Sequence, residues 1–179
     1  MLPQGLRAEP VVSVDAVHRI LAGDLLPTIR AAVADLGGDE PGSLVHTRPT
    51  PAGSGWPTNS AAVLVHHLCG VLTSWGAACL GGETISRDRG AEFAYTGPVE
   101  PELDRLAALV DRLPGWLAAA VERGDLADPA GTTVDVGRAR AAGTFTPDWV
   151  VAHILHEVAA HTGQLQVTRD VLAPRGSSQ

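Results

Sequence analysis

Residues 150–165, VVAHILHEVAAHTGQL, predict one amphipathic helix that carries chemical groups on its inner face. Thr146 is a typical N-cap residue, and Pro147 follows it at a position that favours the first helical turn. At about 100° per residue, one stripe is apolar, with His161 near its centre and Glu157 at its edge. The apolar members of this stripe are Val150, Ile154, Val158, Leu165 and Leu172.

Glu157 and His161 need a partner if their side chains face the protein core. Burying an unpaired charge is costly, and a divalent cation would compensate both groups. A direct interaction between the two side chains at helical spacing is the alternative, because Glu-x-x-x-His also arises in helices that bind no metal. The metal interpretation therefore requires a third ligand from another helix.

A second predicted helix supplies a candidate for that ligand. It ends at Gly81-Gly82, and its possible N-caps are Thr58, Asn59 and Ser60. His67 shares a face with the large apolar side chains of this helix, whereas His66 lies about 100° away. Periodicity therefore favours His67 as the inward imidazole, although a core histidine without a metal is the alternative.

Two further amphipathic helices complete the predicted fold. One spans about residues 11–36, where Pro27 should kink or divide it, and the other spans about residues 99–123, where Pro114 should bend it. We therefore predict an all-α fold, a four-helix bundle with long inter-helix connections. Such bundles build metal sites from side chains on facing helices.

The predicted connections differ in character. Residues 37–57 form a loop that is long enough to be functional or mobile, and residues 85–97 form a polar connector. Residues 124–145 are predicted to be irregular, with a short strand or hairpin arm at 132–136. We expect residues 173–179 to be a frayed tail.

Length and composition restrict the class of protein. The 179 residues suit a single domain, 1–179, with a real core. We identify no uninterrupted apolar run long enough to span a bilayer and no N-terminal signal, so we expect a cytoplasmic protein without a membrane partner. The net charge of −7 and the absence of a basic cluster argue against nucleic-acid binding.

The reactive residue types are also limited. All 13 basic residues are arginines, so a Schiff-base or lysine-nucleophile mechanism is excluded. Cys69 and Cys79 lie about 15 Å apart along one predicted helix, too far to pair. We interpret them as buried structural thiols rather than catalytic ones.

His67, Glu157 and His161 would together form a set of two imidazoles and one carboxylate. This set suits Zn²⁺ with an open fourth position, and it also accepts Fe²⁺, Ni²⁺ or Mn²⁺. His66, His153 and His156 permit other ligand assignments. His153 is the strongest rival, as a ligand or as a hydrogen-bond partner of a ligand, because it lies four residues before Glu157.

These motifs resemble the DinB-like metal-binding four-helix-bundle superfamily over essentially the whole chain. The resemblance rests on Gly55-Trp56, Asn59-Ser60, His67-Leu68-x-Gly70, Glu157-x-x-x-His161-x-Gly163-Gln164 and Arg169. Many members have His-x-x-x-His in the last helix, whereas the Glu-x-x-x-His of this chain is similar to the mycothiol-dependent maleylpyruvate isomerase branch and related thiol-dependent S-transferases. The resemblance implies zinc binding by His67, Glu157 and His161. Residues 87–93 also resemble a stretch in uncharacterised relatives.

The resemblance implies a metal-dependent enzyme that uses a low-molecular-weight thiol such as mycothiol, as an S-transferase or isomerase acting on a small electrophile. Because the chain ends soon after the fourth helix, we expect it to lack the additional C-terminal domain of the isomerase. His153 is our candidate acid or base. Arg87 or Arg89 is our candidate for binding a substrate carboxylate, unless their connector is only a solvated, salt-bridged loop.

Two other functions remain open at the level of the sequence. One is a non-catalytic, metal-binding, dimeric bundle whose ion is closed off by a further histidine, either His153 or His46. The other is a metal-assisted hydrolase that uses water as its nucleophile. Superfamily members commonly pair through their helices, so we expect a homodimer under either function.

Overall fold

The computed structural model describes residues 13–50, 58–127 and 134–173, and within these ranges all regular structure is helical. The all-α prediction is therefore confirmed for the described chain. The α-helices are α1 (Val14–Ile20), α2 (Leu26–Asp35), α3 (Ala61–Leu72), α4 (Arg89–Glu92), α5 (Glu100–Arg123), α6 (Val134–Ala141) and α7 (Pro147–Leu172). Two π-helical segments are η1 (Leu21–Leu25) and η2 (Thr73–Leu80).

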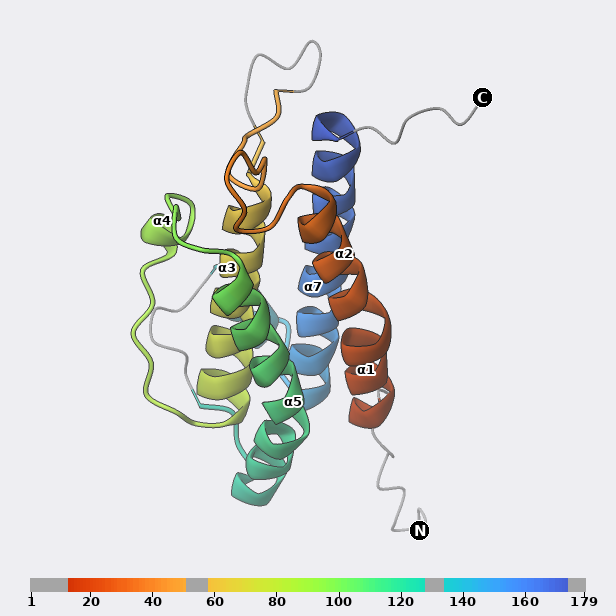
Figure 1. Cartoon of the computed structure of the whole chain (residues 1–179). Coiled ribbons are helices and arrows are strands. Elements are labelled where there is room, and N and C mark those ends of the chain that lie inside the picture. The colour runs from red at the N-terminus through yellow and green to blue at the C-terminus, as the bar shows by residue number, and fades with distance from the viewer. Residues whose placement is uncertain (1–12, 51–57, 128–133, 174–179) are drawn as a thin grey trace, which may run out of the picture.

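The long helical segments lie side by side around one apolar core (Figure 1). α3 packs against α5 and α7, and η2 continues α3 against the same two neighbours. The segment made of α1, η1 and α2 packs on α5 and α7 from the other side. Fully buried side chains from all of these segments meet in the core, including Leu21, Ile29, Leu68, Leu106, Ile154 and Leu165.

The segment Ala61–Leu80 is the most apolar part of the chain. It is long and apolar enough to cross a membrane, although polar residues such as His66 and His67 interrupt its apolar run. However, 89% of its most apolar window is buried inside the protein. This is the burial expected of the central helix in a folded core.

The starts of two helices follow the predicted capping signals. The Ser60 hydroxyl accepts a hydrogen bond from the Val63 N–H, and the Thr146 hydroxyl accepts one from the Trp149 N–H. Ser60 is thus the cap among the three predicted candidates. These two caps begin α3 and α7, the helices that carry the predicted ligands.

The prediction that Pro27 kinks or divides the first helical segment is met only by a change of helix type, because the run from Val14 to Asp35 is helical throughout, with a π-helical turn before α2. The π-helical turn η1 ends directly before α2, and the Leu26 N–H bonds to the Leu21 carbonyl five residues earlier. Proline lacks an N–H and its ring crowds the preceding turn, so the chain widens there without ending the helix. By contrast, Pro114 lies inside α5, which is assigned as one continuous helix.

Two connections contain helices that the sequence patterns did not indicate. Residues 134–136 belong to α6, so the predicted strand or hairpin arm there is wrong at these residues. Within residues 85–97, α4 forms a single turn capped by Asp88, whose side chain accepts a hydrogen bond from the Ala91 N–H. Figure 1 shows α4 on the outer side of α3. Trp56 and residues 174–179 of the expected tail lie outside the described residues.

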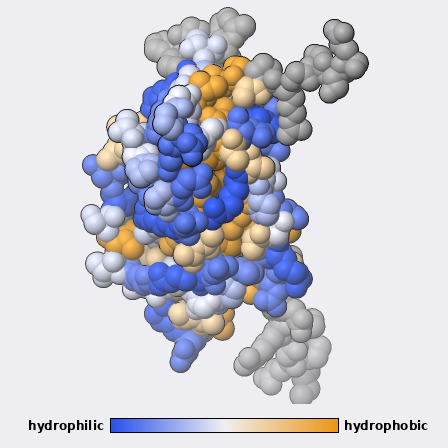
Figure 2. Space-filling model, viewed as in Figure 1, coloured by the Kyte–Doolittle hydropathy of each residue, from blue (hydrophilic) through white to orange (hydrophobic). Residues whose placement is uncertain are grey.

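The visible surface is mainly hydrophilic (Figure 2). An apolar area interrupts it in the upper part of the same view, between the loop that precedes α3 and the end of α7. Val167 and Val171, near the end of α7, are 63% and 53% exposed. They border a cavity of about 230 Å³ that Pro49 and Leu64 also line.

Candidate functional site

Three predicted side chains converge between α3 and α7. One nitrogen or oxygen atom from each of His67, Glu157 and His161 lies within 4.8 Å of the others. The two imidazole rings meet edge to face, with their centroids 4.9 Å apart. The His161 Nε2 atom lies 3.6 Å from Glu157 Oε2. The fold therefore brings together residues that are about 90 positions apart in the sequence.

Both imidazoles have a hydrogen-bond partner at Nδ1, which leaves Nε2 of each ring available. His67 Nδ1 lies 2.8 Å from Glu92 Oε2, and His161 Nδ1 lies 2.8 Å from Gln164 Oε1. Carboxylate and amide oxygens accept hydrogen bonds, so each neutral ring carries its proton on Nδ1 and keeps the Nε2 lone pair. Two such nitrogens beside a carboxylate form a donor set that divalent transition metals bind.

The electrostatics of Glu157 and His161 are coupled. The interaction with His161 holds the pKa of Glu157 below its usual value, and Glu157 raises the pKa of His161. Their separation of 3.6 Å is longer than a normal hydrogen bond. A direct contact between the two therefore satisfies them only partly, whereas a cation between them would satisfy both.

Glu92 is the site residue that the sequence reasoning missed. It is only 5% exposed, and it binds His67 on one side and Arg87 on the other. The Arg87 guanidinium donates through Nε to Oε1 at 2.6 Å and through Nη2 to Oε2 at 2.9 Å. Burial opposes ionisation of Glu92, but the hydrogen bonds from His67 and Arg87 outweigh it and lower its pKa to about 2. Glu92 therefore orients His67 as an ionised carboxylate.

Gly70 makes room for this carboxylate. A Cβ atom at position 70 would overlap Glu92 Oε1, far inside van der Waals contact. A larger residue here would push Glu92 away from His67, one helical turn earlier. The signals available in the sequence were the His67-Leu68-x-Gly70 motif and the charged stretch 87–93, but neither showed that the two meet.

The two predicted anion-binding arginines have different surroundings. Arg87 is largely buried and its guanidinium is occupied by Glu92. Arg89 is exposed, and both arginines line a small cavity together with His67 and Glu157. The structure thus gives Arg87 an internal partner and leaves Arg89 beside the cluster.

Two of the rival histidines are also separated by the fold. His66 Nδ1 lies 2.9 Å from Glu102 Oε2, and its ring stacks on Tyr95 at 4.1 Å, on a face of α3 away from the cluster. His153 Nε2 lies 3.8 Å from Glu157 Oε1. The His153 ring stacks on Trp149, with centroids 4.8 Å apart and planes within 7°. His153 therefore contacts the cluster through Glu157.

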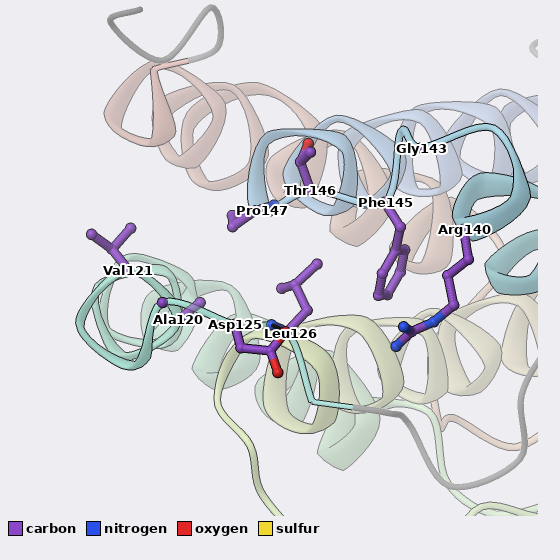
Figure 3. A pocket seen from close by; sticks show the side chains of 10 residues that line it. Ala120, Val121, Asp125, Leu126, Arg140, Gly143, Phe145, Thr146 and Pro147 are labelled. Atoms are coloured by element: carbon purple, nitrogen blue, oxygen red, sulfur yellow. Dashed lines mark hydrogen bonds between the residues drawn. The ribbon is translucent and has the colours of Figure 1, made fainter. Parts of the chain in front are cut away.

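A small cavity and an adjoining groove show where a ligand could reach these groups. The cavity at the cluster holds about 30 Å³, and an adjoining groove between α6 and α7 holds about 440 Å³. The cavity and the groove share His153 and Glu157. A third cavity of about 460 Å³ lies between the ends of α5 and α6 and the start of α7 (Figure 3), and it shares no lining residue with the cluster. A choice of site by cavity volume alone would therefore favour a cavity that is remote from the candidate ligands.

Comparison with known proteins adds one match. The family model described as Mycothiol-S-transferase matches residues 28–174, a span that includes the cluster residues and Glu92. No curated protein and no solved structure matches the chain. The matched span begins within α2 and extends past the end of α7.

Proposed function

The chain belongs to the mycothiol S-transferase family, within the DinB-like superfamily, and on this premise we propose that it is a metal-dependent enzyme acting with a low-molecular-weight thiol. The proposed reaction is S-transfer to, or thiol-assisted isomerisation of, a small electrophile. We assign His67, Glu157 and His161 as the metal ligands, with Zn²⁺ as the first candidate ion. We further propose that residues 1–179 form one domain with the DinB-like four-helix-bundle architecture.

The observation that supports this proposal is the shared orientation of the ligands. Glu92 and Gln164 occupy Nδ1 of the two rings, which leaves Nε2 of each histidine to act as a ligand beside Glu157. The cluster borders a cavity and, among the described residues, offers three candidate ligands. Catalytic zinc sites have three protein ligands and an open position, whereas structural sites have four.

The reaction needs an activated thiol and a route for its proton. A thiol bound to a divalent cation loses its proton readily, and this is the chemistry that the ion would supply. His153 lines the cavity beside Glu157, so we assign it the role of accepting the thiol proton. A bond then forms between sulfur and the electrophilic carbon, and the displaced electron pair leaves with the leaving group or takes back the proton from His153.

The protein's own thiols do not compete in this scheme. Cys69 and Cys79 are both buried, and burial raises the pKa of the Cys69 thiol strongly. A buried thiol with a raised pKa is a poor nucleophile. The attacking sulfur is therefore assigned to the thiol cosubstrate.

Of the two candidate arginines, Arg89 fits the role of binding a substrate anion. Both arginines line the cavity at His67 and Glu157, but the Arg87 guanidinium is occupied by Glu92. A guanidinium pairs well with a carboxylate in a partly enclosed site. We therefore assign Arg89 to the electrophile and Arg87 to the support of Glu92.

The two alternative functions are less well supported. A closed structural ion would need a fourth ligand, but His46 is exposed and His153 approaches Glu157 rather than the cluster centre. A metal-assisted hydrolase could use the same three ligands, yet the family match favours a thiol. We also retain as proposals a cytoplasmic homodimer and the absence of nucleic-acid and membrane partners.

Metal analysis of purified variants tests the ligand assignment. We expect one Zn²⁺ per unmutated chain, and strongly reduced zinc in His67→Ala, Glu157→Ala and His161→Ala. His66→Ala is the matched control, because His66 is adjacent in the chain but binds Glu102. Full zinc content in all three cluster variants would end the assignment.

A thermal-shift titration of the zinc-loaded protein tests the thiol. Mycothiol should raise the unfolding temperature, because a ligand that binds only the folded state stabilises it. Formation of a mycothiol conjugate with a fluorogenic electrophile should require bound zinc. Zinc-dependent ester hydrolysis without any thiol-dependent stabilisation would instead favour the hydrolase.

A further inference from the structure

The groove between α6 and α7 is large enough for a ligand that does not fit beside the cluster. The cavity at the cluster, about 30 Å³, accommodates little more than an ion or a water molecule. The groove, about 440 Å³, is in the size range of small-molecule sites. His153 and Glu157 line both. A ligand in the groove would therefore reach the cluster directly.

The lining of the groove combines an aromatic wall with neutral and cationic polar groups. Trp149 and His153 stack face to face along the α7 side. The small side chains of Ala139 and Ala142 line the α6 side. The remaining polar groups are Arg138, Thr144 and His156, and Glu157 is the one carboxylate among the described residues of the lining.

This chemistry suits a polyhydroxylated ring better than a charged or wholly apolar ligand. Hydroxyl groups both donate and accept hydrogen bonds, and the side chains of Thr144 and His156 offer partners for them. The guanidinium of Arg138 adds donors, and the C–H faces of a sugar ring pack well against an indole such as Trp149. An apolar ligand would leave these polar groups without partners.

We propose that this groove binds the glycosidic part of the thiol, with the sulfur directed past His153 and Glu157 to the cluster. This inference rests on the proposed function and adds the residues that recognise the thiol. It also separates the two substrates in space, because Arg89 lines the small cavity but not the groove. The electrophile would then approach on the side of Arg89.

The test compares two thiols on the cobalt-loaded full chain, whose absorption spectrum changes when a thiolate binds the ion. Mycothiol carries sugar rings, and N-acetylcysteine presents a similar thiol without them. The variants are Arg138→Ala and His156→Ala, both at exposed positions where folding should persist. Arg140→Ala is the control, because Arg140 also belongs to α6 but lies over Phe145 in the separate cavity of Figure 3.

We expect each groove variant to weaken mycothiol binding about tenfold, the usual effect of losing one such hydrogen bond. Binding of N-acetylcysteine and cobalt content should remain unchanged, and Arg140→Ala should behave like the unmutated protein. Unchanged mycothiol binding in both groove variants, or an equal loss for both thiols, would overturn the groove assignment alone. A groove variant that changed only the KM for an anionic electrophile, and not mycothiol binding, would also overturn the groove assignment. Failure of the unmutated protein to bind any thiol would instead overturn the proposed function together with this inference.

Discussion

At the residue scale, the best-defined feature of the site is the chain of contacts from Arg87 through Glu92 to His67. Each link has hydrogen-bond geometry, and Glu92 is almost completely buried. A carboxylate behind a metal-binding imidazole fixes the ring and makes its free nitrogen more basic. The chain of contacts therefore has a function that does not require Glu92 to touch a substrate.

Replacing Glu92 tests this role. Glu92→Gln should lower zinc affinity about 10- to 100-fold, because the amide removes the negative charge behind His67 while keeping a similar shape. Competition with a chromophoric zinc chelator measures the affinity. Glu102→Gln provides the control, since Glu102 makes the equivalent contact with His66. Equal zinc affinity in Glu92→Gln and the unmutated protein would show that Glu92 only fills space.

Gly70 offers a steric test of the same contact. Gly70→Ala should destabilise the protein by about 1–3 kcal/mol, the usual cost of overpacking, because the added methyl overlaps Glu92. Urea unfolding of the zinc-free protein gives this value. Gly115→Ala is the control, since a Cβ there meets no atom within 4 Å and alanine favours helix. Gly115→Ala should therefore leave the free energy of unfolding unchanged or raise it. If Gly70→Ala proved as stable as Gly115→Ala, the predicted overlap with Glu92 would be contradicted.

At the element scale, local sequence signals predicted the helix starts better than they predicted the connections. The caps at Ser60 and Thr146 use short-range chemistry that is visible in the sequence. The helix at 134–141 has no comparable signal, and its valine-rich start suggested a strand. Glu92 was missed for a related reason. It belongs to a polar connector without periodicity, and only the tertiary contact of α4 with α3 brings it to His67.

The candidate ligands were predictable because each lies on a long helix with clear periodicity. Their wheel positions correctly placed His67 inward and separated it from His66. The wheel was less accurate for His161, which is half-buried at the edge of the inner face, while Thr162 beside it is buried. A single helical wheel does not show which neighbouring helix covers its edge, and here α3 approaches from the side of His161.

The cap of α3 gives an element-scale prediction. Ser60→Ala should lower the free energy of unfolding by about 1 kcal/mol, because the Val63 N–H loses its acceptor at the buried end of the helix. Chemical denaturation followed by circular dichroism measures the change. Ser60→Thr should keep more of the stability, since threonine also caps helices and adds no charge at this buried position. A loss in Ser60→Thr equal to that in Ser60→Ala would indicate that packing, and not capping, matters at this position.

At the scale of the whole molecule, the same helices form both the apolar core and the candidate site. α3 contributes both to the buried apolar segment Ala61–Leu80 and, through His67, to the candidate site, so this candidate ligand is held within the core. α7 instead has one face in the core and the other beside the groove and the apolar area at its end. The candidate site therefore lies where the buried helix α3 meets α7, whose outer side is exposed.

The apolar area at the end of α7 gives the support for the proposed homodimer. Val167 and Val171 are exposed next to an apolar cavity, and their side chains would be covered if two copies paired there. We expect light scattering after size-exclusion chromatography to give about twice the chain mass of 18.5 kDa. Val167→Glu should shift the protein to the monomer, because an unpaired carboxylate is costly in an apolar interface.

Val121→Glu is the matched control, because Val121 is similarly exposed, at 67%, but lies on α5 and does not line this cavity. The control should keep the mass of the unmutated protein, and Val167→Glu should retain zinc because the ligands lie elsewhere on α7. A dimer that survives Val167→Glu but dissociates in Val121→Glu would move the interface to α5. If the unmutated protein were a monomer at high concentration, the homodimer proposal would fail. The candidate site would then be formed within one chain.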